Sequence, residues 1–214
     1  MILAAMKKNI FSILLLLTSF NIWSQHHSQK NDTQLIAILD TVYNAEQIDR
    51  VRMAEVQKQY GWQSRQVDSL WRKIKLQDST NLVKVKSIIE TYGWLGPDKV
   101  GEEGAKTIFL VIQHADSLTQ VTYVSLLREA VKNKKARPQD LALLEDRILT
   151  RQGKKQIYGS QLTQSGSEEK YLFLPIEDEA NVNKRRAAIG LEPIEDYAKR
   201  FGIDYVFPAT DPQK

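Results

Sequence analysis

The sequence contains no cysteine among its 214 residues. The fold therefore has no disulfide, no thiol nucleophile and no cysteine to which a lipid could be attached. A chain of this length forms one domain of ordinary size by default. Without covalent cross-links, its stability must come from a buried apolar core, and about 190 residues can form one.

The familiar catalytic signatures are also missing. The sequence has no H-E-x-x-H, no G-x-S-x-G and no paired histidines or cysteines at zinc spacing. Gly96 and Gly101 have the outer spacing of a phosphate loop, but Glu102 and Glu103 follow where lysine and a hydroxyl residue belong. Two carboxylates there would repel phosphate, so we predict no nucleotide site, no cofactor and no metal site.

Charge of one sign is only slightly in excess. The formal net charge is +4, and it falls to +2 without residues 1–24, which contain two lysines and no acid. Such a balance does not favour nucleic acid as a partner.

Residues 1–24 have the layout of a secretory signal. Lys7 and Lys8 precede an apolar core, Ile10–Phe20, and Ser24 offers a small residue for cleavage. We expect export to the periplasm or the exterior, with no stable membrane span after cleavage, because the apolar core is too short to span comfortably. An uncleaved N-terminal anchor remains the alternative, and Met6 could be the true start.

Cleavage after Ser24 would leave a polar, flexible segment, residues 25–31, that begins Gln25-His26-His27. A free amine with histidine at the third position can bind Cu(II) or Ni(II). Cyclisation of Gln25 would remove that amine, so we regard this metal site as weaker than the polar site described below.

Apolar periodicity predicts about six or seven helices in a single domain, residues 32–204, followed by a tail, residues 205–214. The central one is Ala105–Asp116, because Ile108 to Ile112 is apolar without interruption and belongs inside a domain. The other expected elements are a long helix from Asp32 or Thr33, a helix around Val67–Ile74, a third capped by Asp78, Ser79 or Thr80, a loop at Trp94–Gly104, helices after Ser117 and Pro138, and short helices in Asn181–Ile189 and Leu191–Phe201.

Strand character is confined to one stretch. Gln156–Thr163 and Lys170–Leu174 predict two short strands joined across Ser165-Gly166-Ser167. The expected fold class is therefore α+β and predominantly α-helical, with a small antiparallel β-hairpin near residues 156–174.

A scattered polar set forms the candidate site: His114, Asp116, Arg147, Tyr158 and Gln161. His114 is the natural acid–base group, and Asp116 could orient it if the helix ends there. Arg147 could hold a carboxylate or phosphate, and it should be partly buried because it neighbours an inward position. Tyr158 and Gln161 face one site only if the strand bulges at Gly159.

Structural roles compete with this hypothesis. His114 could satisfy a backbone carbonyl, and Asp116 could cap the next helix in competition with Ser117. Arg147 could pair with Asp140, Glu145 or a glutamate elsewhere. In the first helix, Glu46, Asp49 and Arg50 could be solvated charges with local pairing.

Several motifs occur in a fixed order: Y-G-W-L-G-P (92–97), Val100-Gly101, Q-H-A-D (113–116), Asp146-Arg147, Y-G-S-Q (158–161) and K-R-R-A-A-I-G-L-E-P-I (184–194). Together they resemble the bacterial family named domain of unknown function 6624, over roughly Ile36–Tyr197. Here Y-G-S-Q stands where the family more often has Y-G-T-Q, and Glu46-Gln47-x-x-Arg50 resembles its early acidic-Gln-x-x-Arg element. The resemblance implies candidate positions and no reaction.

Two functions from different classes follow. The favoured one is an exported module that binds a small molecule or an envelope protein at a polar site around His114, Arg147 and Tyr158, with Gln161 as a further contact. The alternative is an envelope or extracellular enzyme that uses His114 as general acid or base. The sequence does not decide whether the protein is an enzyme, but it offers no evident nucleophile or metal cage.

Overall fold

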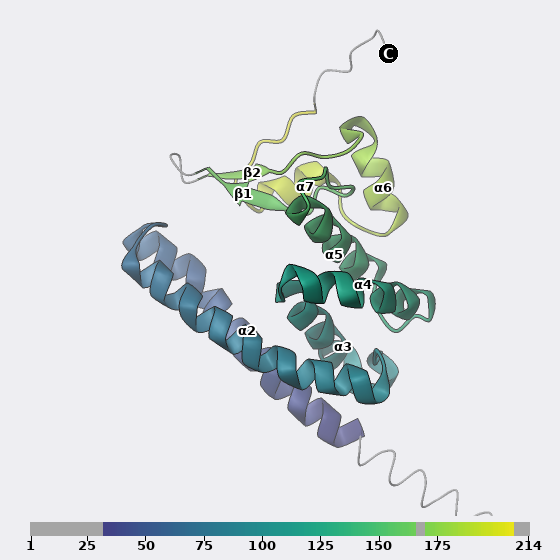
Figure 1. Cartoon of the computed structure of the whole chain (residues 1–214). Coiled ribbons are helices and arrows are strands. Elements are labelled where there is room, and N and C mark those ends of the chain that lie inside the picture. The colour runs from purple at the N-terminus through teal and green to yellow at the C-terminus, as the bar shows by residue number, and fades with distance from the viewer. Residues whose placement is uncertain (1–31, 166–169, 208–214) are drawn as a thin grey trace, which may run out of the picture.

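The computed structural model describes residues 32–165 and 170–207, and these are mostly helical (Figure 1). The elements in chain order are an N-terminal helix (32–60), α2 Arg65–Tyr92, α3 Pro97–His114, α4 Ser117–Lys132, α5 Pro138–Arg151, β1 Leu162–Gln164, β2 Tyr171–Phe173, the 3-10 helix η1 Glu179–Asn181, α6 Val182–Ala188 and α7 Ile194–Lys199. The two strands pair antiparallel, with Leu162 opposite Phe173. The predicted helix-dominated α+β fold with one small hairpin is confirmed.

Several predictions concern residues outside the described part of the chain. They are the signal sequence (1–24), the segment that begins Gln25-His26-His27 (25–31), part of the turn between the strands (166–169) and the end of the tail (208–214). No helix within the described ranges is both long enough and apolar enough to cross a membrane.

The N-terminal helix and α2 form a long antiparallel hairpin (Figure 1). Gly61 lies at the turn with φ +82°, and the Ser64 side chain caps α2 by accepting from the Val67 amide. The prediction of two separate helices here is wrong, since α2 runs without a break. The expected cap residues Ser79 and Thr80 instead donate to backbone carbonyls four residues earlier, so the helix itself satisfies them.

Helix α3 is central, because it contacts α2, α4 and α5. It begins at Pro97, earlier than predicted, so the expected loop Trp94–Gly104 is wrong over most of its length. A kink at Gly101, with φ 70° and ψ 169°, separates its first turn from the apolar run. Ile108 and Ile112 are fully buried in the main core, which also contains residues of the N-terminal helix, α2, α4 and α5.

Helices α4 and α5 pack against each other, and α5 begins at Pro138 as expected. In Figure 1, α5 lies between α3 and the C-terminal part of the chain, where β1, β2, α6 and α7 gather. A small separate core holds this part together around Ile176, Val182 and Ile194.

The strands are shorter than predicted. Residues 156–161 form no strand apart from a single bridge between Gln156 and Ile176. At Gly159, φ is +67°, and a Cβ there would lie 2.6 Å from Ile194 Cδ1. The backbone turns tightly against the C-terminal core at this point, and this turn shapes the loop that holds Tyr158 and Gln161.

Candidate functional site

His114 lies at the last residue of α3, and its Nδ1 contacts the Glu46 carboxylate from the N-terminal helix. The Glu46 side chain is completely buried, whereas 22% of the His114 side chain is exposed. A carboxylate that holds one imidazole nitrogen and leaves the other toward solvent is the arrangement found in acid–base pairs. The sequence predicts Asp116 in this position beside His114, whereas the carboxylate that contacts His114 in the structure is that of Glu46.

Glu46 belongs to a larger charged network in the helical hairpin. Arg50 Nη1 is 2.8 Å from Glu46 Oε1, and Arg50 Nη2 lies 2.8 Å from both carboxylate oxygens of Asp78 on α2. Burial raises the pKa of Asp78, although the hydrogen bond and charge of Arg50 oppose that shift. These groups join the hairpin to the end of α3, so Glu46 and Arg50 are more than solvated charges.

The end of α3 also lies along one face of α5. Gln113 Nε2 donates to the Leu143 carbonyl at 3.4 Å, and Arg151 Nη1 donates to the Ala115 carbonyl at 3.0 Å. On a helix, residues four apart share a face, so Arg147 lies between these two contacts. The end of α3, which includes His114, therefore packs against the face of α5 that includes Arg147.

Arg147 is largely buried and has no acidic partner within the described ranges. No hydrogen bond or ion pair there involves its guanidinium, and its Nε is buried without a partner. Burial, together with the positive charges of Arg151 and Arg50, lowers the pKa of Arg147 to about 10. Buried charges are normally paired, so this guanidinium calls for an explanation. We call Glu46, Arg50, His114 and Arg147 the interhelical site.

Two further atoms of this region are buried without a partner: Glu46 Oε2 and Gln113 Oε1. Gln161 reaches the edge of the same region, because its Nε2 also lies 3.4 Å from the Leu143 carbonyl. Gln113, to which the sequence assigns no role beside His114, therefore joins the end of α3 to α5.

Asp116 is not part of the interhelical site. Its side chain is exposed and caps α4, where it accepts hydrogen bonds from the amide and the hydroxyl of Thr119, both at 2.9 Å. These bonds lower the pKa of Asp116. Ser117, the competing candidate for the cap, is the first residue of the helix and not its cap. The Gln120 side chain donates to the Gln113 carbonyl and so joins α4 to the end of α3.

Tyr158 is held elsewhere, by the neighbour of Arg147. The carboxylate of Asp146, which is fully buried, accepts from the amides of Ile157, Tyr158 and Ser160 and from the Ser160 hydroxyl. Burial raises the pKa of Asp146, and these donors oppose the shift. We call Asp146 and the loop 157–160 the Asp146 cradle.

The basic motif near the C-terminus closes the other side of this cradle. Arg185 Nε donates to the Ile157 carbonyl at 2.9 Å, and Arg186 Nη1 donates to the Tyr158 carbonyl at 2.7 Å. Arg186 is 1% exposed and lies over the Tyr197 ring, 5.0 Å from its centroid. The Asp146, Y-G-S-Q and K-R-R motifs thus satisfy one another through the backbone of Tyr158, whose side chain forms no hydrogen bond with the described residues.

These motifs agree with the comparison of the whole sequence with protein families. Residues 32–207 match a family of unknown function, DUF6624. The chain belongs to this family. No curated protein and no solved structure matches it. Membership in DUF6624 supplies no reaction, so function must be argued from the geometry.

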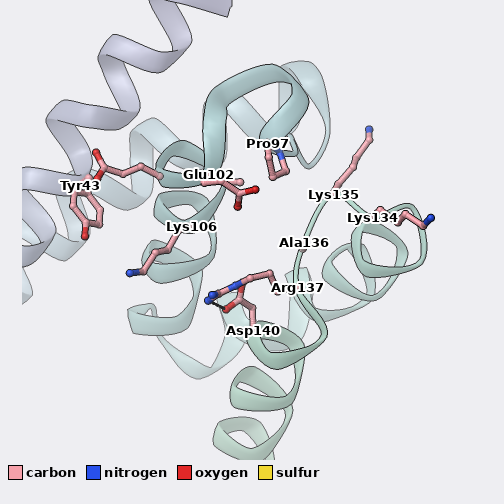
Figure 2. A pocket seen from close by; sticks show the side chains of 11 residues that line it. Tyr43, Pro97, Glu102, Lys106, Lys134, Lys135, Ala136, Arg137 and Asp140 are labelled. Carbon is pink, nitrogen blue, oxygen red and sulfur yellow. Dashed lines mark hydrogen bonds and ion pairs between the residues drawn. The ribbon is translucent and has the colours of Figure 1, made fainter. Parts of the chain in front are cut away.

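Two surface hollows lie apart from the interhelical site. One, of about 320 Å³, is lined by Lys106, Arg137 and Asp140 among others, and Figure 2 shows Arg137 beside Asp140 with Lys106 across from them. The other, of about 490 Å³, lies between α5 and the C-terminal part and is lined by Ser160 and Tyr197 among others. Each contains at least one ion pair, between Arg137 and Asp140 in the first and between Arg200 and Glu192 in the second. No cluster of three or more potential metal ligands occurs in the part of the chain that the structure describes.

Proposed function

We propose that this chain is an exported binding module that holds a small anionic molecule at the guanidinium of Arg147. The observation that carries the proposal is the Arg147 side chain itself, which is charged, partly buried and without a partner among the described residues, with its Nε fully buried. A carboxylate or phosphate is the natural partner of a guanidinium, because its oxygens match the planar N–H donors.

The surroundings support an anion over a cation. Arg50 and Arg151 both lie close enough to lower the pKa of Arg147, and Arg50 already engages Glu46 Oε1 and both carboxylate oxygens of Asp78. The Arg147 Nη atoms are not among the buried unpartnered atoms, so they are the ones a ligand could reach. Binding would also remove the cost of leaving a buried charge without a partner.

Thermal unfolding with added ligand tests the proposal. Phosphate, propionate and lactate are added to the wild type, to Arg147→Met and to Arg128→Met. Arg128 is a matched control, since its side chain is 48% exposed and paired with Glu145. A ligand at one hundred times its Kd should stabilise the wild type and the control by about 2.7 kcal/mol and leave Arg147→Met unchanged. Equal stabilisation of all three proteins, or none in any, would rule the proposal out.

The pairing of His114 with Glu46 favours a second candidate, an envelope or extracellular enzyme with His114 as general acid or base. A panel of phosphate and carboxylate esters, assayed with wild type, His114→Gln and Arg147→Met, separates the two functions. An enzyme should lose turnover in His114→Gln while it still binds substrate. If no ester is turned over but anions bind, the binding module is the better account.

Export rests on the basic start, the apolar core and Ser24 within residues 1–24. N-terminal sequencing of the protein from its host should find Gln25 first. A mature protein that still contains Leu14 to Leu17 would favour the anchor instead.

A further inference from the structure

The proposed anion site has a second reachable group, the free nitrogen of His114. Nε2 forms no hydrogen bond with any residue in the described ranges, and it is not among the buried atoms there. What this nitrogen would contact depends on whether it donates or accepts a hydrogen bond, so the tautomer of His114 matters.

The network around Glu46 decides the tautomer. Arg50 Nη1 lies 2.8 Å from Glu46 Oε1, and a guanidinium can only donate, so this oxygen acts as an acceptor of a carboxylate. The same oxygen contacts His114 Nδ1. Two acceptors cannot bond to each other, so Nδ1 carries a proton and donates it to Glu46. In a neutral imidazole, Nε2 is then an acceptor that faces solvent.

The site therefore presents donors at Arg147 and an acceptor at His114, and the end of α3 that carries His114 packs against the face of α5 that carries Arg147. The acceptor would suit a hydroxyl or an ammonium group. The charges of Arg50, Arg147 and Arg151 oppose a second cation, so a hydroxyl fits better.

We infer that the ligand is a small hydroxylated anion whose carboxylate or phosphate binds Arg147 and whose hydroxyl donates to His114 Nε2. This inference rests on the proposed anion site and adds its selectivity. Hydroxy acids and phosphorylated polyols have this chemistry, whereas simple carboxylates and inorganic anions lack the hydroxyl.

Matched ligand pairs test the selectivity by isothermal titration calorimetry. Lactate and propionate share a carboxylate and differ in one hydroxyl. Glycerol 1-phosphate and propyl phosphate share a phosphate and differ in two hydroxyls. One net hydrogen bond should make the hydroxylated member of the favoured pair bind roughly three- to tenfold more tightly. Alanine, which has an ammonium group in place of the lactate hydroxyl, should bind more weakly than lactate.

Variants assign the effect to residues. In His114→Phe, which has no acceptor, the two members of each pair should bind equally. In Glu46→Gln, the amide can donate to Nδ1 and turn Nε2 into a donor, so the hydroxyl preference should shrink. Far-UV circular dichroism establishes that each variant is folded, and His114→Phe alone suffices if Glu46→Gln does not fold.

The outcomes separate this inference from the proposed function. Equal binding of both pair members to wild type, abolished in Arg147→Met, would overturn the hydroxyl inference and leave the anion site intact. Alanine that binds more tightly than lactate would overturn it too. If the binding of no anion depends on Arg147, both the proposed function and this inference are wrong.

Discussion

Asp146 and Arg147 are adjacent on α5, but their buried charges have opposite surroundings. Asp146 accepts hydrogen bonds from three backbone amides and one hydroxyl. Arg147 has no partner among the described residues. Residues one apart on a helix point about 100° away from each other, so the two side chains leave α5 in different directions. The contrast separates a motif that builds the fold from the residue at which we propose that a ligand binds.

Arg186 sharpens the contrast, because it has the same chemistry as Arg147. Burial lowers the pKa of both guanidiniums. Arg186 nevertheless donates to the carbonyls of Glu192 and Tyr158, both at 2.7 Å. Burial alone therefore does not leave an arginine unpaired in this protein, which makes the state of Arg147 specific to its position.

The largest effect is expected at Asp146. Asp146→Ala leaves three buried amides without an acceptor, and we expect the free energy of unfolding to fall by about 3–5 kcal/mol. Urea unfolding measures the loss. Glu145→Ala on the same helix is the control, because its surface pair with Arg128 should be worth less than about 1 kcal/mol. Similar losses in both variants would contradict a special role for the cradle.

Gly159 tests the tight turn within the cradle. An alanine there must adopt φ +67°, and its Cβ would lie 2.6 Å from Ile194 Cδ1 and 3.0 Å from Ile176 Cδ1. We expect Gly159→Ala to cost about 2–4 kcal/mol, from backbone strain and overpacking together. Gly153 has φ +71°, but a Cβ added there would meet nothing within 4 Å, so Gly153→Ala isolates the strain, at about 1 kcal/mol. Equal urea midpoints for the two variants would show that the contact is unimportant.

Unlike the changes at Asp146 and Gly159, a substitution of Arg147 should not lower the stability of the fold. Without added anion, Arg147→Met removes an unpaired buried charge and keeps most of the side-chain volume, so stability should stay equal or rise by about 1–2 kcal/mol. Arg186→Met, which removes a partnered guanidinium, should instead lose about 2–4 kcal/mol. Urea unfolding in a buffer free of phosphate and carboxylates measures both. A large loss in Arg147→Met would mean that Arg147 supports the fold.

The helices could be predicted from sequence because their apolar residues recur at helical spacing, as Leu35, Leu39 and Val42 do in the N-terminal helix. The break within α2 was predicted wrongly because Ser79 and Thr80 are good caps in isolation. Their hydroxyls bond to their own helix, and the packing of the hairpin keeps that helix continuous. The strands were predicted too long because the Asp146 cradle holds residues that would otherwise extend β1.

The candidate site was predictable only in part. His114 and Arg147 stood out because each is a charged or polar residue next to an inward apolar one. Glu46 did not, because its burial depends on how the first helix packs against a residue 68 positions later in the chain. Tyr158 and Arg147 belong to motifs of the same family, and sequence order alone could not show that Asp146 holds the backbone of Tyr158 while Arg147 has no hydrogen-bond partner among the described residues.

The smallest expected effect is at Asp116, which sequence analysis placed beside His114 and the structure places at the cap of α4. Asp116→Ala should cost about 1 kcal/mol, the usual value of such a cap, and Asp116→Asn should cost less because asparagine also caps.

The folded-state pKa of Asp116 is lowered below its ordinary value of 3.8, so the ionised carboxylate stabilises the fold above that pH. That contribution is lost as the pH falls through the folded-state pKa. The gap in stability between wild type and Asp116→Ala should therefore be constant from pH 7 to pH 5 and narrow below about pH 4. Anion binding at Arg147 should be unchanged in Asp116→Ala. A loss of binding in this variant would show that Asp116 contributes to the site.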